Sequence, residues 1–452
     1  MLSKIFRSYD IRGIYGEDIN EEIFDKIGNA FTLVTPKDIL IARDARMSSE
    51  KLLNAFMNGA LRAERTVMNI GELPLGCAYH WATTQNFELA YITASHLPPQ
   101  WNGLKFFHAT GEAYMQHENE RIKKIVESSR YIVGVRGVPV REEIDDVINL
   151  YVRHLTGKIK LSDEEKKKSK MKILIDCGNG TASIVAGKLF REAGFSADLI
   201  FEKPDGSFPN RLSDPNEDPL NELRKRVSKY DFGIAFDGDC DRVVFMDRTG
   251  RKLLTEQASY VMLNELLKSG KGTILANVEC SSLIDEIAKR SGTNVVRFRV
   301  GHTFMLNAVS RTEGAVFALE RSGHYVIPFL SSFDDAIAAA LYFAYALHKS
   351  GKQLEQILKE VPSTCLDISK FACSDEKKLA VVERLQEKFS SEYSNLDTLD
   401  GVRINLGSSW ALARASNTEP VIRLTVEAGS EAAMNELKSK FSRIIEEEIK
   451  KA

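Results

Sequence analysis

The stretch from Tyr91 to Phe106 reads YITASHLPPQWNGLKF, and its pattern of a strand followed by a polar loop recurs along the chain. The apolar run Glu88 to Thr93 predicts a buried strand that ends near Ser95, because the two prolines that follow prevent a helix or strand from continuing. A serine on such a loop, beside the imidazole of His96 and near the ammonium of Lys105, is placed like a nucleophile or a phosphoryl carrier. An ordinary turn would show the same local pattern, so the rest of the chain has to decide.

Other strands also end in polar loops that precede helical periodicity. Asp38 to Ala42 ends in an arginine-bearing loop, and Lys172 to Asp176 ends in a glycine turn that we interpret as structural. Alternating strands and helices predict α/β units, in which ligands bind beyond the carboxyl ends of the strands. We expect at least two of the three arginines near the early loops to brace them through neighbouring aspartates, rather than to bind a ligand: Arg12, Arg43 and Arg46.

Length and composition limit the class of protein. A chain of 452 residues is longer than one hydrophobic core usually organises, so several domains are expected. The net charge of −2 gives no basic surplus for nucleic acid or for anionic membranes, and neither is expected as a partner. Without a signal-like N-terminus or a long apolar stretch, the protein is expected to be cytoplasmic. Its six cysteines form no C-x-x-C pair, which argues against a zinc site or a disulfide framework.

Changes in pattern divide the chain into four units. The charge run from Ser162 to Lys170 is typical of a solvated turn or helix end and marks a boundary, and beyond Pro362 the elements become fewer and longer. The last unit predicts a smaller α+β domain that ends in an amphipathic helix. We expect three similar mixed α/β domains at residues 1–150, 151–249 and 250–364, and the C-terminal domain at residues 365–452.

The loop between the strands Gly233 to Phe236 and Val243 to Met246 carries three carboxylates at alternate positions, Asp237, Asp239 and Asp241. Carboxylates that converge in a tight loop repel one another unless a cation lies among them, so the loop predicts a divalent, oxygen-seeking metal. An EF-hand would match the aspartates, but arginine stands at the positions of its turn glycine and its final glutamate, and the flanks are strands. A solvated acidic turn stays open as the alternative.

Two polar clusters follow in the third unit, at residues 300–303 and 319–324. The second presents an acid, a hydroxyl and an imidazole on alternate residues, Glu320, Ser322 and His324, and the first carries His302. Such groups after a strand suit the hydroxyls of a polyol. A plain surface position is nearly as good an interpretation of Glu320.

A loop in the last unit combines a guanidinium with several neutral donors. A phosphate needs several donors and a positive charge, which this set supplies. The alternative is a polar turn in which the arginine pairs with Glu419. The candidate phosphate-binding residues are Arg414, Ser416, Asn417 and Thr418.

Together these loops resemble those of the α-D-phosphohexomutases, the family of phosphomannomutase, phosphoglucomutase and phosphoglucosamine mutase. The family's phosphoserine loop, T-A-S-H-N-P followed by N-G-x-K, is similar to Thr93 to Pro98 and Asn102 to Lys105. Its metal loop D-G-D-x-D-R, sugar loop G-E-x-S-G-H and phosphate loop R-x-S-N-T-E-P follow here in the same order, and Y-D-I-R-G matches Tyr9 to Gly13. The ordered set is far more specific than any one motif.

The resemblance implies four domains around a central active-site cleft, and an enzyme that interconverts hexose 1-phosphate and hexose 6-phosphate, with mannose or glucose as the sugar. Phosphorylated Ser95 would give its phosphoryl group to the free sugar hydroxyl, and the resulting hexose 1,6-bisphosphate, also the activator, would turn over in the cleft. One Mg²⁺ would be held by a phosphoserine oxygen and the three aspartates. The catalytic residues would be Ser95, His96, Lys105, Arg12, Arg242 and His324.

The remaining loops would bind the substrate. Glu320 and Ser322, with His302, would hold sugar hydroxyls, and the residues from Arg414 to Thr418 would grip the phosphate that is not reacting. The sequence departs from the family at Leu97, Leu319 and Arg321. Arg321 either contacts an anion or points to solvent. A phosphoglucosamine mutase or a non-catalytic sugar-phosphate-binding relative therefore stays as the alternative, and the sequence leaves open a monomer or a homo-oligomer.

Overall fold

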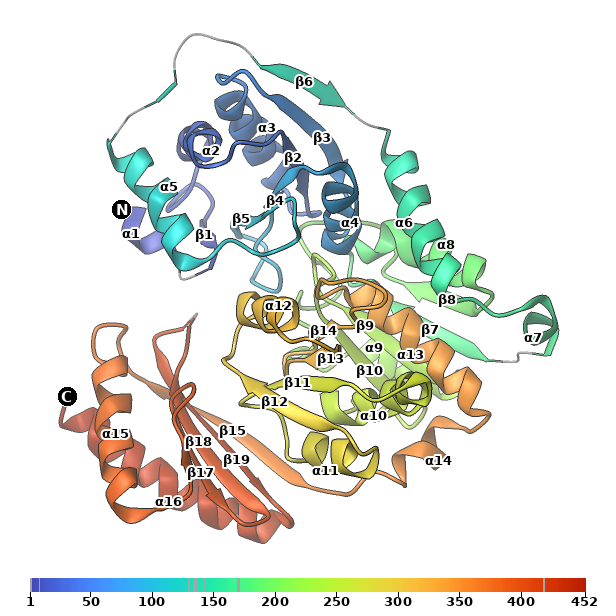
Figure 1. Cartoon of the computed structure of the whole chain (residues 1–452), viewed down its shortest axis with the longest axis vertical. Coiled ribbons are helices and arrows are strands. Elements are labelled where there is room, and N and C mark those ends of the chain that lie inside the picture. The colour runs from blue at the N-terminus through green and yellow to red at the C-terminus, as the bar shows by residue number, and fades with distance from the viewer. Residues whose placement is uncertain are drawn as a thin grey trace.

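Four β-sheets in chain order form the framework of the molecule (Figure 1). The computed structural model describes residues 2–7, 9–128, 131–132, 137–141, 143–168, 171–417 and 419–452. Three of the sheets are mixed and carry helices, whereas the last is antiparallel throughout. This architecture confirms the predicted fold class of three α/β domains and a smaller C-terminal domain.

The first unit holds a six-stranded sheet in the order β1-β5-β4-β2-β3-β6. Its central strands are apolar and buried because helices cover them, and α2 begins where the side chain of Asn20 accepts a hydrogen bond from the backbone N–H of Ile23. The elements are α1 (Leu2–Ile5), β1 (Ile11–Ile14), α2 (Glu21–Val34), β2 (Ile39–Arg43), α3 (Ser49–Ala60), β3 (Thr66–Glu72), α4 (Leu75–Gln85), β4 (Glu88–Ile92), β5 (Trp101–Phe107), α5 (Gln116–Ser128) and β6 (Val138–Arg141).

The second unit holds a four-stranded sheet in the order β10-β9-β7-β8. It is preceded by α6 (Ile144–Lys158), which spans the predicted boundary at residue 150. The predicted charge run forms α7, and its last two residues, Ser169 and Lys170, lie outside the described part of the chain. The elements are α7 (Asp163–Lys168), β7 (Lys172–Asp176), α8 (Ala182–Ala193), β8 (Ser196–Ile200), α9 (Asn221–Arg226), the 3₁₀ turn Val227–Lys229, β9 (Phe232–Phe236) and β10 (Val243–Asp247).

The third unit holds a four-stranded sheet in the order β12-β11-β13-β14. The apolar pattern of the sequence continues back to Phe333, but α13 begins at Ala336, because the side chain of Asp335 caps it by accepting from the N–H of Ala338. Phe333 and Asp334 therefore lie in the preceding loop. The elements are α10 (Thr255–Leu266), the 3₁₀ turn Leu267–Ser269, β11 (Thr273–Asn277), α11 (Leu283–Arg290), β12 (Asn294–Phe298), α12 (His302–Arg311), β13 (Ala315–Leu319), β14 (Tyr325–Val326), α13 (Ala336–Ser350) and α14 (Leu354–Leu358).

Each of the three mixed sheets has one loop at an equivalent position in its strand order. In each sheet a parallel strand (β4, β9 or β13) is followed by a loop and then by an antiparallel neighbour (β5, β10 or β14). These are the loops of Ser95, of the three aspartates and of Glu320. The carboxyl ends of three corresponding strands thus supply three of the four predicted site loops, as expected for α/β sheets.

The fourth unit is an antiparallel sheet in the order β15-β19-β18-β17-β16, and α15 and α16 pack against it. Strand β18 is buried along most of its length, and the predicted phosphate loop connects it to β19. The elements are β15 (Cys365–Ala372), α15 (Lys378–Glu392), β16 (Leu396–Asp397), β17 (Val402–Leu406), β18 (Ser409–Ala415), β19 (Val421–Ala428) and α16 (Glu431–Lys450).

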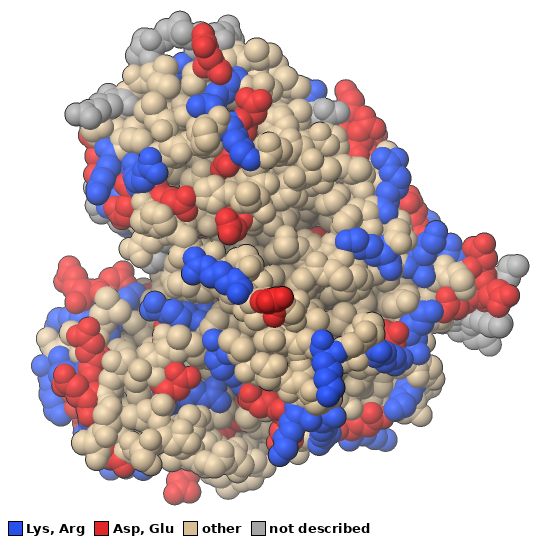
Figure 2. Space-filling model, in the orientation of Figure 1, with Lys and Arg blue, Asp and Glu red and all other residues tan. Residues whose placement is uncertain are grey.

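A hydrophobic core shared by the first three units runs from Leu40 to Leu358, and the first and second units each hold a further cluster. The fourth unit takes no part in the shared core and has its own. A small cluster of Val278, Trp410 and Leu412 joins the fourth unit to the third. Figure 2 shows a notch in the outline between the first and fourth units, and Lys and Arg mix with Asp and Glu over this face. No helix in the described part of the chain is long and apolar enough to cross a membrane.

Candidate active site

Ser95 lies on the loop from β4 to β5 and is almost completely buried, with 1% of its surface exposed. Its backbone is left-handed, with φ of 51°, which is uncommon for a residue other than glycine. The backbone N–H of Ser95 donates to Thr93 Oγ1 at 2.8 Å. Its own Oγ donates to Asp237 Oδ2 at 3.0 Å and lies 3.2 Å from Nδ1 of His96. The predicted nucleophile and the predicted metal loop are therefore in direct contact.

Arg46 binds the backbone of the loop that carries Ser95, called the serine loop below. Its buried guanidinium donates to the backbone carbonyls of Ser95 and Leu97 at 2.7 and 2.6 Å, and to those of Pro98 and Trp101. Arg46 also pairs with Asp44 at 3.0 Å. The expectation that arginines brace the early loops is confirmed for Arg46. Leu97, one of the departures from the family pattern, takes part in this contact through its backbone carbonyl and not through its side chain.

The other two early arginines are also paired. Arg43 Nη1 pairs with Glu72 at 2.6 Å, and Arg12 Nε pairs with Asp10 at the same distance. Arg12 differs from the others, because its Nη1 is buried and has no hydrogen-bond partner among the described residues. One end of this guanidinium thus remains available for an anion.

The three aspartates of the loop between β9 and β10 are almost fully buried. Their oxygens lie close enough together to hold one metal ion, and Oδ1 of Asp239 and Oδ1 of Asp241 have no hydrogen-bond partner in the described part of the chain. Burial and the neighbouring carboxylates Asp241 and Asp239 raise the pKa of Asp237 well above its usual value. Buried acceptors without donors, on carboxylates that converge and repel one another, fit a site for a divalent cation.

Lys105 on β5 partly neutralises this loop. Its ammonium lies 3.0 Å from Asp239 Oδ2 and 2.5 Å from Asp241 Oδ2. Burial lowers the pKa of Lys105, but the two carboxylates outweigh burial and raise it. For Asp241, burial raises the pKa and Lys105 lowers it, and the net effect is a pKa well below the usual range. Lys105 therefore supplies positive charge to the acidic loop.

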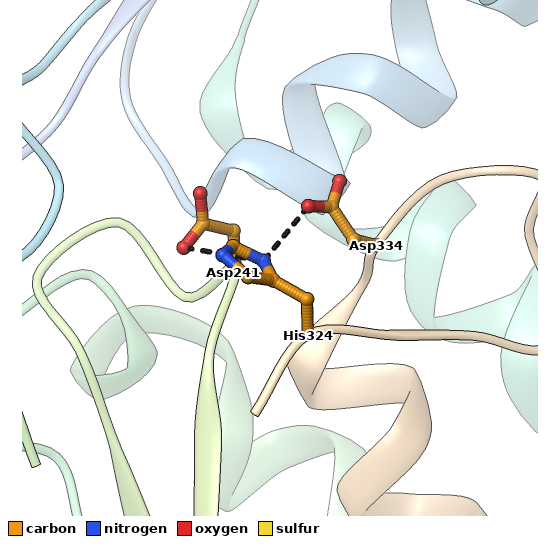
Figure 3. Close-up of side chains that lie close together, drawn as sticks. All are labelled: Asp241, His324 and Asp334. Atoms are coloured by element: carbon orange, nitrogen blue, oxygen red, sulfur yellow. Dashed lines mark ion pairs between the residues drawn. The ribbon is translucent and has the colours of Figure 1, made fainter. Parts of the chain in front are cut away.

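His324 connects the metal loop to the third unit. Nε of Arg242 donates to its Nε2 at 3.0 Å, and its Nδ1 lies 2.8 Å from Oδ2 of Asp334 and 3.9 Å from Oδ1 of Asp241. Figure 3 shows the imidazole between these two carboxylates. Burial lowers the pKa of His324, but Asp241 and Asp334 outweigh it and raise the pKa. The same imidazole stacks against His302 at a centroid distance of 6.3 Å.

Glu320 is buried, with 3% of its surface exposed, so a plain surface position is excluded. Its Oε1 accepts from Nδ2 of Asn277 at 3.1 Å and from the N–H of Gly301 at 2.8 Å, which fixes the carboxylate at the end of β13. Ser322, two residues later, is half-buried. Arg321 has a buried Nη1 without a hydrogen-bond partner among the described residues, so its guanidinium does not simply face solvent.

Arg414 projects from β18 toward the third unit. Its Nε donates to Oε1 of Glu279 at 2.6 Å, so the alternative in which it pairs with Glu419 is wrong. Nδ2 of Asn417 donates to the carbonyl of Val300 at 3.0 Å. Glu419 instead pairs with Arg423, and Ser416 Oγ accepts from the N–H of Glu419 at 3.2 Å. Thr418 lies outside the described residues.

The predicted site residues fall into two groups. Contacts join the first group from Ser95 and His96 through the aspartates and Lys105 to Arg242, His324 and His302. In the described part of the chain, Arg414 and Asn417 have no hydrogen bond to that group and contact the third unit instead. Three important residues were missed, Thr93, Glu279 and Asp334. Their contacts join positions far apart in the sequence, and only Thr93 lies within a recognisable motif.

Family models for the four domains of phosphoglucomutase/phosphomannomutase match the chain in order. The alpha/beta/alpha domain I matches residues 3–132, domain II residues 149–250 and domain III residues 252–365, and the C-terminal domain matches residues 369–444. The chain belongs to the phosphoglucomutase/phosphomannomutase family. It is a phosphohexomutase, as the names of its family and relatives indicate.

Relatives match over almost their whole length. A probable phosphoglucosamine mutase from Methanopyrus kandleri is 31% identical, with 98% of each chain covered. A phosphoglucomutase/phosphomannomutase from Thermococcus kodakarensis is 31% identical, with 99% of this chain and 100% of the relative covered. The crystal structure of a phosphoglucomutase/phosphomannomutase family protein from Burkholderia thailandensis has a TM-score of 0.87 at 26% identity, covering 99% of this chain and 98% of that chain.

Proposed function

We propose that this phosphohexomutase interconverts hexose 1-phosphate and hexose 6-phosphate, with mannose, glucose or both as the sugar, through a phosphoserine at Ser95 and a hexose 1,6-bisphosphate. The observation that carries the proposal is the hydrogen bond from Ser95 Oγ to Asp237 Oδ2 at 3.0 Å. It puts a buried hydroxyl, held in a left-handed turn, directly beside an acidic loop that fits a cation. A serine so placed suits reversible phosphorylation.

Asp237, Asp239 and Asp241 would hold one Mg²⁺ together with an oxygen of the phosphoserine. The ion would supply charge neutralisation at the phosphoryl group. The buried, unpartnered oxygens of Asp239 and Asp241 support this assignment. Lys105 would shift its contacts among the two carboxylates and the phosphoryl oxygens, because an ammonium is a flexible point charge.

The phosphoryl group passes from Ser95 to the free hydroxyl of the sugar. The sugar oxygen forms the new P–O bond, the bond to Ser95 Oγ breaks with its electron pair on Oγ, and a side chain removes the hydroxyl proton. His324 or Lys105 would move this proton, and the neutral imidazole is the better acceptor. Positioning and neutralisation of charge are the main requirements of this reaction. Burial, and then the positive charges of Arg242 and Arg12, lower the pKa of His96, the neighbour of Ser95. These two arginines would therefore add positive charge near the phosphoryl group.

The substrate needs grips at both ends, because the bisphosphate must present each phosphate to Ser95 in turn. Arg414, Ser416, Asn417 and Thr418 would hold the phosphate that is not reacting. Glu320 and Ser322 would hold sugar hydroxyls, with His302 beside them. The buried and rigidly held carboxylate of Glu320 supports its part in this binding.

The alternative is phosphoglucosamine mutase activity, which the name of the relative from Methanopyrus kandleri favours. A non-catalytic sugar-phosphate-binding protein is the second alternative, which the departures at Leu97, Leu319 and Arg321 motivated. The four domain ranges predicted from the sequence, the cytoplasmic location and the absence of nucleic-acid or membrane partners stay predictions.

The test is a coupled assay with mannose 1-phosphate, glucose 1-phosphate and glucosamine 6-phosphate, each with Mg²⁺ and a trace of the matching hexose bisphosphate. We expect turnover of at least one hexose phosphate, abolition by EDTA and recovery with Mg²⁺. Asp239→Asn should lower kcat by roughly a hundredfold or more, because the cation loses a ligand. The exposed Asp198 on β8 offers a matched control, and Asp198→Asn should keep full activity.

Turnover of glucosamine 6-phosphate alone would establish the first alternative. No turnover of any of the three substrates would contradict mutase activity, and activity indifferent to EDTA would contradict the metal site.

A further inference from the structure

Asp334 is a buried carboxylate that none of the predicted loops contains. It lies in the turn before α13, with 0% of its surface exposed. Neither of its oxygens has an aligned hydrogen bond among the described residues. Its close neighbours are two imidazoles. His324 Nδ1 lies 2.8 Å away (Figure 3), and His302 Nδ1 lies 3.8 Å away. Burial raises the pKa of Asp334 to about 6. A carboxylate kept at such a position needs a cationic or proton-donating partner.

The other side of the His324 ring indicates which nitrogen carries the proton. Nε of Arg242 donates to Nε2 of His324 at 3.0 Å. A guanidinium has no acceptor, so Nε2 must offer a lone pair in this contact. The neutral ring then carries its proton on Nδ1, the atom that lies 2.8 Å from Asp334. Arg242 and Asp334 thus favour the same tautomer from opposite sides.

We propose that Asp334 is the positioning residue that keeps His324 in the Nδ1–H tautomer, so that Nε2 takes the proton of the sugar hydroxyl during phosphoryl transfer. This inference rests on the proposed mutase function. Nε2 becomes available when Arg242 turns from the imidazole to the incoming phosphoryl group. The hydroxyl O–H bond then breaks as an N–H bond forms on Nε2, and the reverse transfer returns that proton.

The surroundings suit the charge that this step creates. An imidazolium at His324 would lie beside the buried Asp334, so the positive charge would be paired on arrival. Lys105 is a poorer acceptor, because its amino group already contacts two carboxylates. His302 contacts Asp334 at 3.8 Å, a longer distance that leaves His324 as the main partner.

A double-mutant cycle tests the proposal, because a residue that acts only through His324 has nothing left to contribute once His324 is gone. We expect Asp334→Asn to lower kcat by roughly 10- to 1,000-fold with KM changed by less than about threefold, since general base catalysis is worth about that much. His324→Ala should lower kcat at least as far. The double variant should be no slower than His324→Ala within about twofold.

The neighbouring Asp335 provides the matched control. It is equally buried, caps α13 and accepts from the hydroxyl of Tyr151 at 2.9 Å, but no contact joins it to His324 among the described residues. Asp335→Asn should lower the midpoint of thermal unfolding and keep kcat within about threefold. A structural role for Asp334 would make the two asparagine variants alike.

A second measurement does not depend on an Asp334 variant. In the wild-type protein labelled with ¹⁵N-histidine, the resonances of His324, assigned by comparison with His324→Ala, should show a protonated Nδ1 and an unprotonated Nε2 in neutral rings. A proton on Nε2 would overturn the proposal. So would an independent, additive loss of kcat in the double variant, or a second bound metal ion that is lost in Asp334→Asn.

If the wild type turns over no hexose phosphate, the proposed function fails. An active wild type with an equally active Asp334→Asn refutes only this inference.

Discussion

Two residues other than glycine have a left-handed backbone in the loops that carry the proposed chemistry. Ser95 lies in the loop between β4 and β5, with φ of 51°, and Cys240 lies in the loop between β9 and β10, with φ of 65°. Such conformations cost on the order of 1–3 kcal/mol each and persist only where the surroundings fix them. For Ser95 the fixing contacts are the hydrogen bond of its N–H to Thr93 Oγ1 and the bond of its carbonyl to Arg46. In this backbone conformation the Oγ of Ser95 faces Asp237 and donates to it, as the proposed phosphoryl transfer requires.

Thr93 is one of the residues that join the serine loop to the metal loop. Its Oγ1 accepts from the N–H of Ser95 and shares its own proton between Asp44 Oδ2 at 2.8 Å and Asp239 Oδ2 at 3.0 Å. Thr93→Val keeps the shape but leaves the buried N–H and the carboxylates without this partner. We expect a loss of about 2–3 kcal/mol in the free energy of unfolding, measured in urea, and a kcat lower by roughly tenfold or more.

Thr93→Ser is the control for this prediction, since it restores the hydroxyl and removes only a methyl group. It should recover most of both losses. If Thr93→Val were as stable and as active as the wild type, the bridge between the two loops would have no role.

At the residue scale, sequence could identify the groups that carry chemistry but not the groups that hold them. Ser95 and the three aspartates stand in short motifs at strand ends, where local pattern is informative. Glu279 and Asp334 stand in no such pattern, and an aspartate just before a helix looks like a cap. Asp335 is that cap, and its neighbour Asp334 turns toward His324. Contacts between residues far apart in the chain leave no local signal.

Helices α4 and α6 pack together with a pair of histidines between them. The rings of His80 and His154 lie 4.2 Å apart between centroids, and Nε2 of His154 contacts the carbonyl of Leu330 at 2.7 Å. Burial, and then the neighbouring His154 and Lys158, lower the pKa of His80 to about 4. The helix pair is therefore built around an imidazole that stays neutral in the folded protein.

This pair predicts a loss of stability in acid. Between pH 6.5 and pH 4 the unfolded chain binds a proton at His80 that the folded protein does not bind, so stability falls as pH falls through this range. We expect His80 to account for at most about 2 kcal/mol of the loss between pH 7.5 and pH 5. His80→Gln should flatten that part of the pH dependence in urea unfolding.

Identical slopes for the wild type and His80→Gln between pH 7.5 and pH 5 would show that His80 titrates normally.

At the element scale, the sequence predicted the strands that precede the serine loop and the metal loop, because apolar runs bounded by glycine, proline and polar residues are strong local signals. The start of α13 shows where such patterns fail. Phe333 continues the apolar pattern backward, so periodicity alone extends the helix, whereas the side chain of Asp335 ends it by taking the N–H of Ala338. Capping competes with periodicity at helix ends and decides the boundary.

At the scale of the whole molecule, the fourth unit stands apart from the other three. Its core is separate, and a small apolar cluster and a few polar contacts join it to the third unit. One of these polar contacts is the buried ion pair of Arg414 and Glu279 at 2.6 Å. Arg414 is also the proposed phosphate-binding residue, so the junction between the units and the substrate grip share one side chain.

Removal of one member of this pair should be more harmful than removal of both. Arg414→Met leaves Glu279 buried and unpaired, and we expect a loss of about 3–5 kcal/mol in the free energy of unfolding. Arg414→Met with Glu279→Gln should recover at least half of that loss, yet stay poorly active, because the phosphate grip is still missing. Urea unfolding and KM for the hexose phosphate measure the two effects.

Arg423, which pairs with Glu419 at the surface of the same unit, is the control, and Arg423→Met should cost less than about 1 kcal/mol. Equal stability of the single and double Arg414 variants would show that the pair does not hold the junction.

The sequence also indicated four units and their order, but not how they meet. The junctions depend on side chains more than a hundred residues apart, such as Arg414 with Glu279 and Ser95 with Asp237. Equivalent strand ends in three similar sheets explain why separate loops converge. That equivalence is a property of topology, which no single motif carries.

The central claim is that Ser95 carries the phosphoryl group, and one measurement tests it most directly. The purified protein is incubated with glucose 1,6-bisphosphate and Mg²⁺, and its intact mass and the masses of its proteolytic peptides are compared with those of Ser95→Ala treated alike. We expect the wild type to gain one phosphoryl group, located at Ser95, and Ser95→Ala to gain none and to lose nearly all mutase activity. A phosphoryl group on another residue, or full activity in Ser95→Ala, would contradict the account.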